Sequence, residues 1–571
     1  TIYFDWNPNK EWGNLTYYWK KGMKAPQKAS KEEARFSKIR FVEKEGSGIY
    51  YYIDKGQLYS YAIKDKKSKK LFQHSVPVSN LQIGKEEGVV YFKQSDNLFK
   101  FDTKLGSLVQ LTNFKKGKSE EKQKEKESFL KEQQKELFQF VRDQEQKEKW
   151  NTANDDAKSD FPKPYFFGKN SIESTKASPK GDFVTFRLRE EAEVKQEEME
   201  LFITADGYNK FRDTKTKVST NNFVNTKMGI YNVAKDTVYM VNFSSLSHIQ
   251  DVPDYFKLYE KNKNLDKKDK LIVAQAPIYN QDGSYAIVEI RSQDNKDRWL
   301  VNLNLATGSF KEIEHQHDEA WIGGPGIPSY AFSSGTLGFL ADNETIYFQS
   351  EITGYSHLYT YNLRTNKKVQ LTQGNWEVRG VVLSKDKKTF YLTTNTTHPG
   401  NREWYKMNVS DAILQPILTN DGAHEVSLSP DEKTLLVRYS YKNKPWELYW
   451  ATNKKGSSLN QITFSTTAAF QEYNWRSPEV ITFKAQDGTP VNARLYTPNR
   501  NQANKAAVIF VHGAGYLQNA HNHWSTYHRE YMFHNLLTDL GYTVLDIDYR
   551  GSDGYGRDVR TGIYRFMGGK D

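Results

Sequence analysis

The chain has 571 residues, more than one ordinary domain holds, so we expect at least two domains with a sizeable core. Its formal net charge is +11, but lysine and glutamate are interspersed, which argues against a nucleic-acid-binding stripe. The absence of cysteine excludes disulfides, thiolate metal sites and a cysteine nucleophile. No apolar run approaches the roughly 18 residues that a membrane span needs.

Aromatic residues make up 14% of the chain, which favours strands, and most of the sequence is typical of a repeated β unit. A tight-turn signal between two strands recurs at Asp282-Gly283, Asp342-Asn343, Asp386-Lys387 and Asp431-Glu432. A third and a fourth strand follow each turn. Four short strands at a period of about 40 to 50 residues indicate a β-propeller blade. One such sheet cannot bury both faces alone, so we expect the blades to stack around an axis.

We therefore predict a β-propeller over residues 1–463 with about eight blades. The first blade is expected to be incomplete, because the sequence starts inside a strand at Ile2. The predicted units begin near Ile2, Phe36, Leu81, Ile172, Ile278, Leu337, Val378 and His424.

Two charged segments interrupt the repeat. Residues 115–149 are almost wholly Lys, Glu and Gln, with Leu130, Leu137 and Val141 at helical spacing, which predicts a narrow-striped helix projecting from the propeller. A disordered charged linker is the alternative. Residues 190–200 form a second, acidic insertion inside the fourth unit.

Residues 464–571 are predicted to begin a second domain of the α/β-hydrolase type. Segments 478–483 and 491–496 alternate as a hairpin does, and Ala506 to Val511 has the composition of a parallel strand buried on both faces. A helix closing at Gly541 and a second buried strand follow. No Gly-x-Ser-x-Gly nucleophile motif occurs anywhere, so the domain is expected to be incomplete.

The loop after the first of these buried strands is the main candidate site. An α/β-hydrolase stabilises a developing oxyanion there, and the glycines of His512-Gly513-Ala514-Gly515 let the backbone approach a ligand. A tight turn without a catalytic role, with His512 as a hydrogen-bonded structural residue, explains the motif equally well. His315, His317 and Asp318 do not make a convincing metal site, so no metal or cofactor is predicted.

The ordered series of motifs resembles the prolyl oligopeptidase family of serine peptidases, and more closely its dipeptidyl peptidase IV branch. The matching motifs are Gly354-Tyr355-Ser356-His357-Leu358-Tyr359, Gln373-Gly374-Asn375-Trp376-Glu377-Val378 and Asp548-Tyr549-Arg550-Gly551-Ser552-x-Gly554-Tyr555-Gly556. The resemblance implies a peptidase for short peptides, with a propeller that screens an interior cavity. The Ser, Asp and His of the family's catalytic triad normally lie downstream of Asp571, so none is assigned here.

Two departures from the family pattern concern the candidate site. Members of this branch commonly place an oxyanion-stabilising Tyr where this sequence has His512, so the donor would be the imidazole or backbone N–H groups. Dipeptidyl-cleaving members carry a Glu pair for the substrate's amine, whereas Glu173 stands alone in that region. Cleavage dipeptide by dipeptide is therefore not supported by the sequence.

The sequence thus predicts the N-terminal portion of a serine peptidase that is inactive by itself. Its expected partners are a short peptide substrate, a C-terminal catalytic segment or chain, and a second copy in a homo-oligomer. A non-enzymatic propeller binding module and an esterase are the alternatives. No signal peptide is visible, and we expect a processed periplasmic or exported protein, with the cytoplasm as the other compartment. We also expect Val508 to Val511 and Val544 to Ile547 to lack sheet neighbours and to expose an apolar edge.

Overall fold

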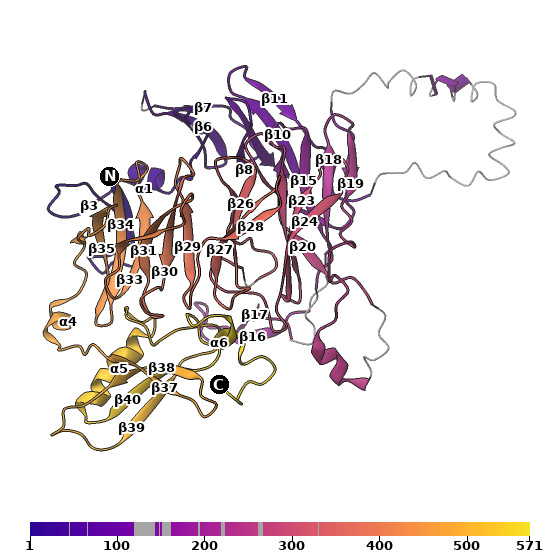
Figure 1. The fold of residues 1–571 in the computed structure, drawn as a ribbon. Coiled ribbons are helices and arrows are strands. Elements are labelled where there is room, and N and C mark those ends of the chain that lie inside the picture. Colours follow the sequence, from indigo (N-terminus) through magenta and orange to yellow (C-terminus); the bar gives the residue numbers. More distant parts are fainter. Residues whose placement is uncertain are drawn as a thin grey trace.

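The computed structural model describes the chain except residues 45, 66, 119–142, 145, 148, 151–160, 192–194, 218–222, 261–266 and 329. The described part is mainly β, as predicted, with few and short helices (Figure 1). None of the described helices is long and apolar enough to cross a bilayer. Eight sheets of three to five strands follow one another through residue 461, and a mixed sheet with helices comes after them.

The first four sheets are antiparallel meanders, and the first has three strands instead of four. Sheet 1 contains β1 (Ile2–Trp6), β2 (Leu15–Trp19) and β3 (Gln27–Lys28); sheet 2 contains β4 (Val42–Glu43), β5 (Ile49–Asp54), β6 (Gln57–Ala62) and β7 (Lys67–Lys70). Sheet 3 contains β8 (Val78–Ile83), β9 (Val89–Gln94), β10 (Asn97–Asp102) and β11 (Ser107–Gln110); sheet 4 contains β14 (Ser171–Ala177), β15 (Phe183–Arg189), β18 (Thr226–Asn232) and β19 (Thr237–Met240).

The next four sheets repeat the same antiparallel order, and in sheet 5 two short strands share one neighbour. Sheet 5 contains β20 (Ile272–Ala274), β21 (Ile278–Tyr279), β22 (Ala286–Ser292), β23 (Asp297–Leu303) and β24 (Phe310–His317); sheet 6 contains β25 (Leu337–Phe339), β26 (Thr345–Ser350), β27 (His357–Asn362) and β28 (Lys367–Gln370). Sheet 7 contains β29 (Val378–Leu383), β30 (Thr389–Thr394), β31 (Glu403–Asn408) and β32 (Leu414–Leu418); sheet 8 contains β33 (Ala423–Leu428), β34 (Thr434–Tyr441), β35 (Lys444–Thr452) and β36 (Asn460–Gln461).

The predicted turn signals lie between β21 and β22 in sheet 5 and between the first and second strands in sheets 6 to 8. In each, the residue after the aspartate adopts a left-handed backbone, with φ of 74° at Gly283 and 58° at Asn343. Consecutive sheets then bury their apolar faces against each other. Trp299 of sheet 5 packs in one cluster with Ile230 of sheet 4, and Leu300 on the opposite face packs with Phe348 of sheet 6. The core is therefore a series of layers between neighbouring sheets.

The charged insertions lie largely outside this core. Most of the predicted helix over 115–149 falls outside the described residues, and 143–144, 146–147 and 149–150 at its end are helical. The acidic segment 190–200 leads into a separate two-stranded hairpin. The other elements before the last sheet are α1 (Lys31–Ser37), β12 (Phe114–Lys115), β13 (Tyr165–Phe166), β16 (Glu198–Leu201), β17 (Lys210–Asp213), the 3₁₀ helix η2 (Asp254–Leu258) and α4 (Ala468–Glu472).

Residues 479–571, here called the C-terminal unit, lie against one end of sheets 5 to 8 (Figure 1). Its elements are β37 (Glu479–Lys484), β38 (Pro490–Tyr496), β39 (Ala507–Val511), α5 (His528–Asp539), β40 (Thr543–Asp548) and α6 (Arg557–Thr561). The predicted hairpin is the antiparallel pair β37–β38, and β39 pairs in parallel with β40. The helix predicted to close at Gly541 is α5, and Gly541 has a left-handed φ of 92°.

Two expectations about this unit are wrong. Val544 to Ile547 were expected to lack sheet neighbours, but β40 pairs with β38 on one side and with β39 on the other. The strand over 506–511 was expected to be buried on both faces, but β39 lies at the sheet edge and Ile509 and Val511 are 64% and 60% exposed. Val508 and Phe510, on the opposite face, pack toward α5. The exposed side of α5 carries an apolar row of Phe533, Leu536 and Leu540. Both surfaces lack a covering layer in the described part of the chain, and the predicted apolar edge at β39 is present.

Candidate functional site

The loop that follows β39 is open to solvent and carries free backbone donors. Residues Gly513 to Tyr516 are exposed, and Gly515 and Tyr516 have left-handed φ values of 116° and 64°. The Gly513 N–H donates to the Tyr527 hydroxyl at 3.1 Å. For the N–H groups of Ala514, Gly515 and Tyr516, no acceptor lies within hydrogen-bond distance among the described residues. These N–H groups can therefore receive an oxygen atom of a ligand.

The His512 side chain, in contrast, is buried, and both of its ring nitrogens have hydrogen-bond partners. Its Nδ1 lies 2.9 Å from the Gly513 carbonyl oxygen, and its Nε2 lies 3.2 Å from both the Asp548 carboxylate and the Ser552 hydroxyl. Burial lowers the pKa of His512, but the hydrogen bonds to Asp548 and to the Gly513 carbonyl outweigh it, so the pKa lies above its ordinary value. The imidazole thus stabilises the loop, and the geometry favours the backbone alternative for oxyanion binding.

Asp548 holds this loop network at the carboxyl end of β40. Its two oxygens accept the backbone N–H groups of Asn519 and Ala520 at 2.6 and 3.0 Å, and the Tyr555 hydroxyl donates to it at 2.6 Å. A serine, a histidine and an aspartate therefore meet here. They do not form a catalytic relay, because Ser552 and Asp548 contact the same imidazole nitrogen and all three side chains are buried.

Buried ion pairs join the C-terminal unit to sheets 6 and 7. The Arg560 guanidinium binds the Glu351 carboxylate through two contacts, and Arg379 bridges Asp553 and Glu377. Burial and the neighbouring Asp553 carboxylate raise the pKa of Glu377, and Arg379 lowers it. These pairs fix the position of α6 and of the preceding loop relative to the sheets.

A glycine makes close backbone approach possible at the same junction. Gly556 has a φ of 84°, and a Cβ atom there would lie 2.8 Å from the Gly354 carbonyl oxygen. That carbonyl accepts the Arg557 N–H at 2.7 Å. Two of the sequence motifs, one in sheet 6 and one after β40, therefore meet at this point, although their spacing in the sequence does not reveal the contact.

Glu173 lies on β14, in sheet 4, beside a strand irregularity at which Ser174 has a left-handed φ of 52°. Its carboxylate is paired with Arg187 at 3.0 Å and with Arg189 at 3.3 Å. In the described part of the chain, no contact joins Glu173 to the loop after His512. Two arginines already neutralise this carboxylate, and its role in binding a substrate amine stays a prediction.

The two histidines considered as metal ligands, His315 and His317, contact the carboxylate of Asp297. His315 Nε2 and His317 Nδ1 lie 2.9 and 2.8 Å from the same oxygen of Asp297, and Lys270 binds its other oxygen. The hydrogen bond to Asp297 raises the pKa of His317. Asp297, which sequence reasoning did not single out, is thus the centre of a buried charge cluster at the end of sheet 5 that faces the C-terminal unit.

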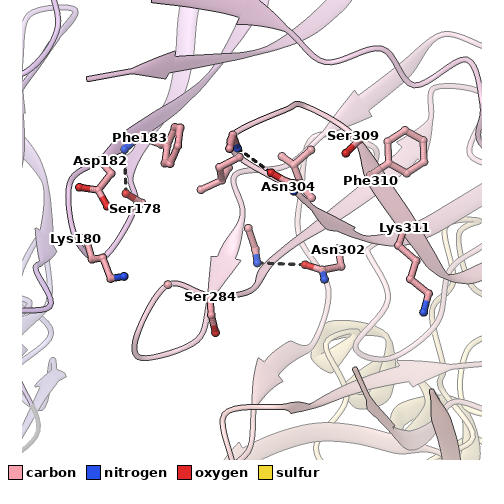
Figure 2. A pocket seen from close by; sticks show the side chains of 15 residues that line it. Ser178, Lys180, Asp182, Phe183, Ser284, Asn302, Asn304, Ser309, Phe310 and Lys311 are labelled. Carbon is pink, nitrogen blue, oxygen red and sulfur yellow. Dashed lines mark hydrogen bonds between the residues drawn. The ribbon is translucent and has the colours of Figure 1, made fainter. Parts of the chain in front are cut away.

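A pocket of about 510 Å³ lies at the opposite end of the sheets (Figure 2). It is formed by the β14–β15 turn of sheet 4 and the β23–β24 turn of sheet 5, whereas the C-terminal unit contacts the β22–β23 turn. Lys180, Asp182 and Lys311 supply its charges, and none of its lining residues is a histidine. The pocket lies away from the loop after His512, so we do not place the chemistry here.

Comparisons with known proteins show similarity to dipeptidyl peptidases. Residues 171–446 match the family described as the dipeptidyl peptidase IV (DPP IV) N-terminal region. Dipeptidyl peptidase 4 of Trichophyton rubrum is 24% identical over 289 residues, which cover 49% of this chain and 36% of that protein. The uncharacterized peptidase YuxL of Bacillus subtilis is 27% identical over 192 residues, which cover 33% of this chain and 28% of that protein. The chain thus spans about a third of the length of these relatives.

Two solved structures share the fold at low sequence identity. Dipeptidyl peptidase 4 of Porphyromonas gingivalis has a TM-score of 0.58 and 15% identity, with 93% of this chain and 65% of that chain covered. A putative dipeptidyl aminopeptidase IV from Bacteroides ovatus has a TM-score of 0.59 and 17% identity, with 93% and 67% covered. Together with the matched motifs, the similarity of residues 171–446 to the dipeptidyl peptidase IV N-terminal region and the fold shared with these two structures support a relation of this chain to the dipeptidyl peptidase IV-like peptidases.

Proposed function

We propose that this chain is the propeller-bearing part of a serine peptidase that hydrolyses short peptides. The observation that carries the proposal is the row of free N–H groups at Ala514, Gly515 and Tyr516. They follow the carboxyl end of a strand in a parallel pair, which is where ligands bind in α/β sheets. Fixed N–H donors at that position stabilise the oxyanion that forms when a peptide carbonyl is attacked.

The eight sheets support a propeller that surrounds access to this loop. Each sheet from 2 to 7 shares an apolar cluster with the next one, and Trp19 of sheet 1 stacks on Trp450 of sheet 8, with ring centroids 6.3 Å apart and planes at 28°. Lys21 also lies over the Trp450 ring at 4.9 Å. A ring of sheets can close only if its first and last sheets are in contact. A ring with the C-terminal unit at one end admits an extended peptide and keeps folded proteins out.

The nucleophile in this proposal comes from a further segment, on the same polypeptide or on a separate chain. Two surfaces support it: the unpaired edge of β39 and the apolar face that carries Ile509 and Val511. Additional parallel strands on that edge would satisfy its backbone groups and cover the face. The buried cluster of His512, Asp548 and Ser552 would then stay a structural support beside the active site.

Turnover assays test the proposal directly. The 571-residue chain alone should not hydrolyse a peptidyl-nitroanilide, and the protein that includes the catalytic segment should hydrolyse it and react with a serine-directed fluorophosphonate. Turnover by the pure 571-residue chain would show that the nucleophile lies within it. A complete protein that binds peptides without cleaving any would favour the non-enzymatic binding module, and preferential cleavage of esters would favour an esterase.

A further inference from the structure

Tyr516 combines an unusual backbone with an exposed ring. Its φ of 64° lies in the left-handed region, which a large side chain rarely adopts, and the residue is 40% exposed. It directly follows Gly515 in the loop that carries the free N–H groups. A strained, exposed aromatic residue beside a candidate site is a reason to look for a ligand contact.

The Tyr516 ring reaches across the junction between the C-terminal unit and the sheets. It lies against Trp321, in the connection between β24 and β25, with ring centroids 5.5 Å apart and planes at 43°. Trp321 also contacts Tyr564 in an edge-on arrangement at 6.3 Å, and the Lys296 ammonium group lies 2.9 Å from the Tyr564 hydroxyl oxygen. Tyr564 therefore supports the Trp321 ring. Tyr516, Trp321 and Tyr564 form an aromatic row, and Tyr516 is its exposed end.

We propose that Tyr516 and Trp321 form an apolar subsite for a substrate side chain next to the scissile bond, an inference that rests on the proposed peptidase function. A carbonyl oxygen held by the N–H groups of Ala514 to Tyr516 belongs to a residue whose side chain starts within about one residue length, roughly 3.8 Å, of this loop. The paired ring faces then meet that side chain or its neighbour. Aromatic faces bind aromatic and large aliphatic groups best, so the subsite should take Phe, Leu or similar residues.

Three variants of the complete protein test the subsite. Tyr516→Gly removes the ring and suits the left-handed backbone, so loss of folding does not confuse the result. Tyr516→Phe keeps the ring. Tyr208→Ala removes a tyrosine that is 78% exposed, in the hairpin of β16 and β17 and away from this loop, and serves as the control. The substrates are two series of peptidyl-nitroanilides and quenched peptides that differ only by Phe or Ala on either side of the scissile bond.

We expect the wild type, Tyr516→Phe and Tyr208→Ala to prefer Phe over Ala by about tenfold in kcat/KM at one of these positions. Tyr516→Gly should bring the ratio close to one by lowering cleavage of the Phe peptide more than that of the Ala peptide. An unchanged ratio in Tyr516→Gly would overturn the inference. An equal loss for both peptides, with a lower Tm, would also overturn it, because the ring would then only join the C-terminal unit to the sheets.

A binding measurement can test the subsite independently of the proposed peptidase activity. Titration calorimetry of the 571-residue chain with unlabelled Phe and Ala hexapeptides needs no nucleophile. If the complete protein cleaves no peptide, the peptidase function fails, and the subsite stands only if the Phe peptide binds more tightly and Tyr516→Gly abolishes the difference. If peptides are cleaved but neither binding nor cleavage depends on the ring, the subsite fails and the peptidase function stands.

Discussion

Arg560 of α6 and Glu351 at the end of β26 form a two-contact ion pair at 2.5 and 2.6 Å, with side chains 4% and 6% exposed. Burial raises the pKa of Glu351 in spite of Arg560, so desolvation of the carboxylate outweighs its attraction to the guanidinium. We predict that Arg560→Met, which leaves Glu351 buried and unpaired, destabilises the docked C-terminal unit by about 3 to 5 kcal/mol. Urea unfolding and hydrogen exchange at α6 measure this loss.

The matched control is the exposed pair of Arg438 and Glu425, which has similar contacts at 2.7 and 3.0 Å. Glu425→Gln should cost less than about 1 kcal/mol, since both partners are solvated. The double variant Glu351→Met with Arg560→Met should be more stable than Arg560→Met alone. If the buried and exposed single substitutions cost the same, the buried pair does not hold the unit in place.

Asp546, in β40, should make stability depend on pH in the acidic range. Burial raises its pKa to about 6, and the hydrogen bond from Asn519 partly opposes this. The folded chain then holds a proton between about pH 4 and 6 that the unfolded chain has released, so stability falls as pH rises through this window. Asp546→Asn should raise the free energy of unfolding by about 1 to 3 kcal/mol at pH 7.5 and leave it unchanged at pH 4.

Asp487 serves as the control, because its pKa is shifted in the opposite direction. Hydrogen bonds from Thr489 and from Arg550 lower its pKa to about 2, so its contribution is present at neutral pH and is lost as pH falls. Asp487→Asn should therefore lower stability at pH 7.5. A loss of stability for Asp546→Asn at pH 7.5, as for Asp487→Asn, would mean that the pKa of Asp546 is not raised.

His512 should titrate above its ordinary range. Its hydrogen bonds to Asp548 and Gly513 favour the protonated ring, and the stability that they add is complete below about pH 6.5 and is lost as pH rises through the folded pKa. An NMR titration of the ring should give a midpoint above about 6.5, and His512→Ala should cost about 1 to 3 kcal/mol at pH 6 and less at pH 9. A midpoint below about 6.5 would contradict the assigned hydrogen bonds.

The repeat and the turn chemistry could be predicted from the sequence because they depend on local signals. The turns at Gly283 and Asn343 need residues that tolerate a left-handed backbone, and such residues stand there. The helix end at Gly541 follows the same rule. Strand alternation likewise predicted the pairing of β37 with β38.

The site could be predicted only as a loop, because its contacts join residues far apart in the chain. Glu351 and Arg560 are separated by 209 residues, and nothing in their neighbours indicates the pairing. The burial of β39 was expected from composition alone, which cannot tell a central strand from an edge strand. For His512 a hydrogen-bonded structural role was one of two interpretations, and its partner Ser552 was quoted only as part of a motif.

Contact between the first and last sheets should appear as a coupling between Trp19 and Trp450. Trp19 is buried in this contact, so Trp19→Ala should cost about 3 kcal/mol and speed hydrogen exchange in β1 and β2. The double variant with Trp450→Ala should cost less than the sum of the single ones by at least about 0.5 kcal/mol. Strict additivity would mean that sheets 1 and 8 do not touch in solution, and the proposed propeller would then not close.

Neighbouring positions on β39 should respond in opposite ways to a charge. Ile509 is 64% exposed on the uncovered face, whereas Val508 packs against Tyr531 and Val544 under α5. In the 571-residue chain, Ile509→Lys should leave Tm unchanged and reduce self-association in light scattering, and Val508→Lys should unfold the C-terminal unit by burying an unpaired charge. In the complete protein, Ile509→Lys should instead destabilise, because the proposed catalytic strands cover that face. If Ile509→Lys is as disruptive as Val508→Lys in the 571-residue chain, both faces of β39 are already covered, and the edge offers no place for further strands.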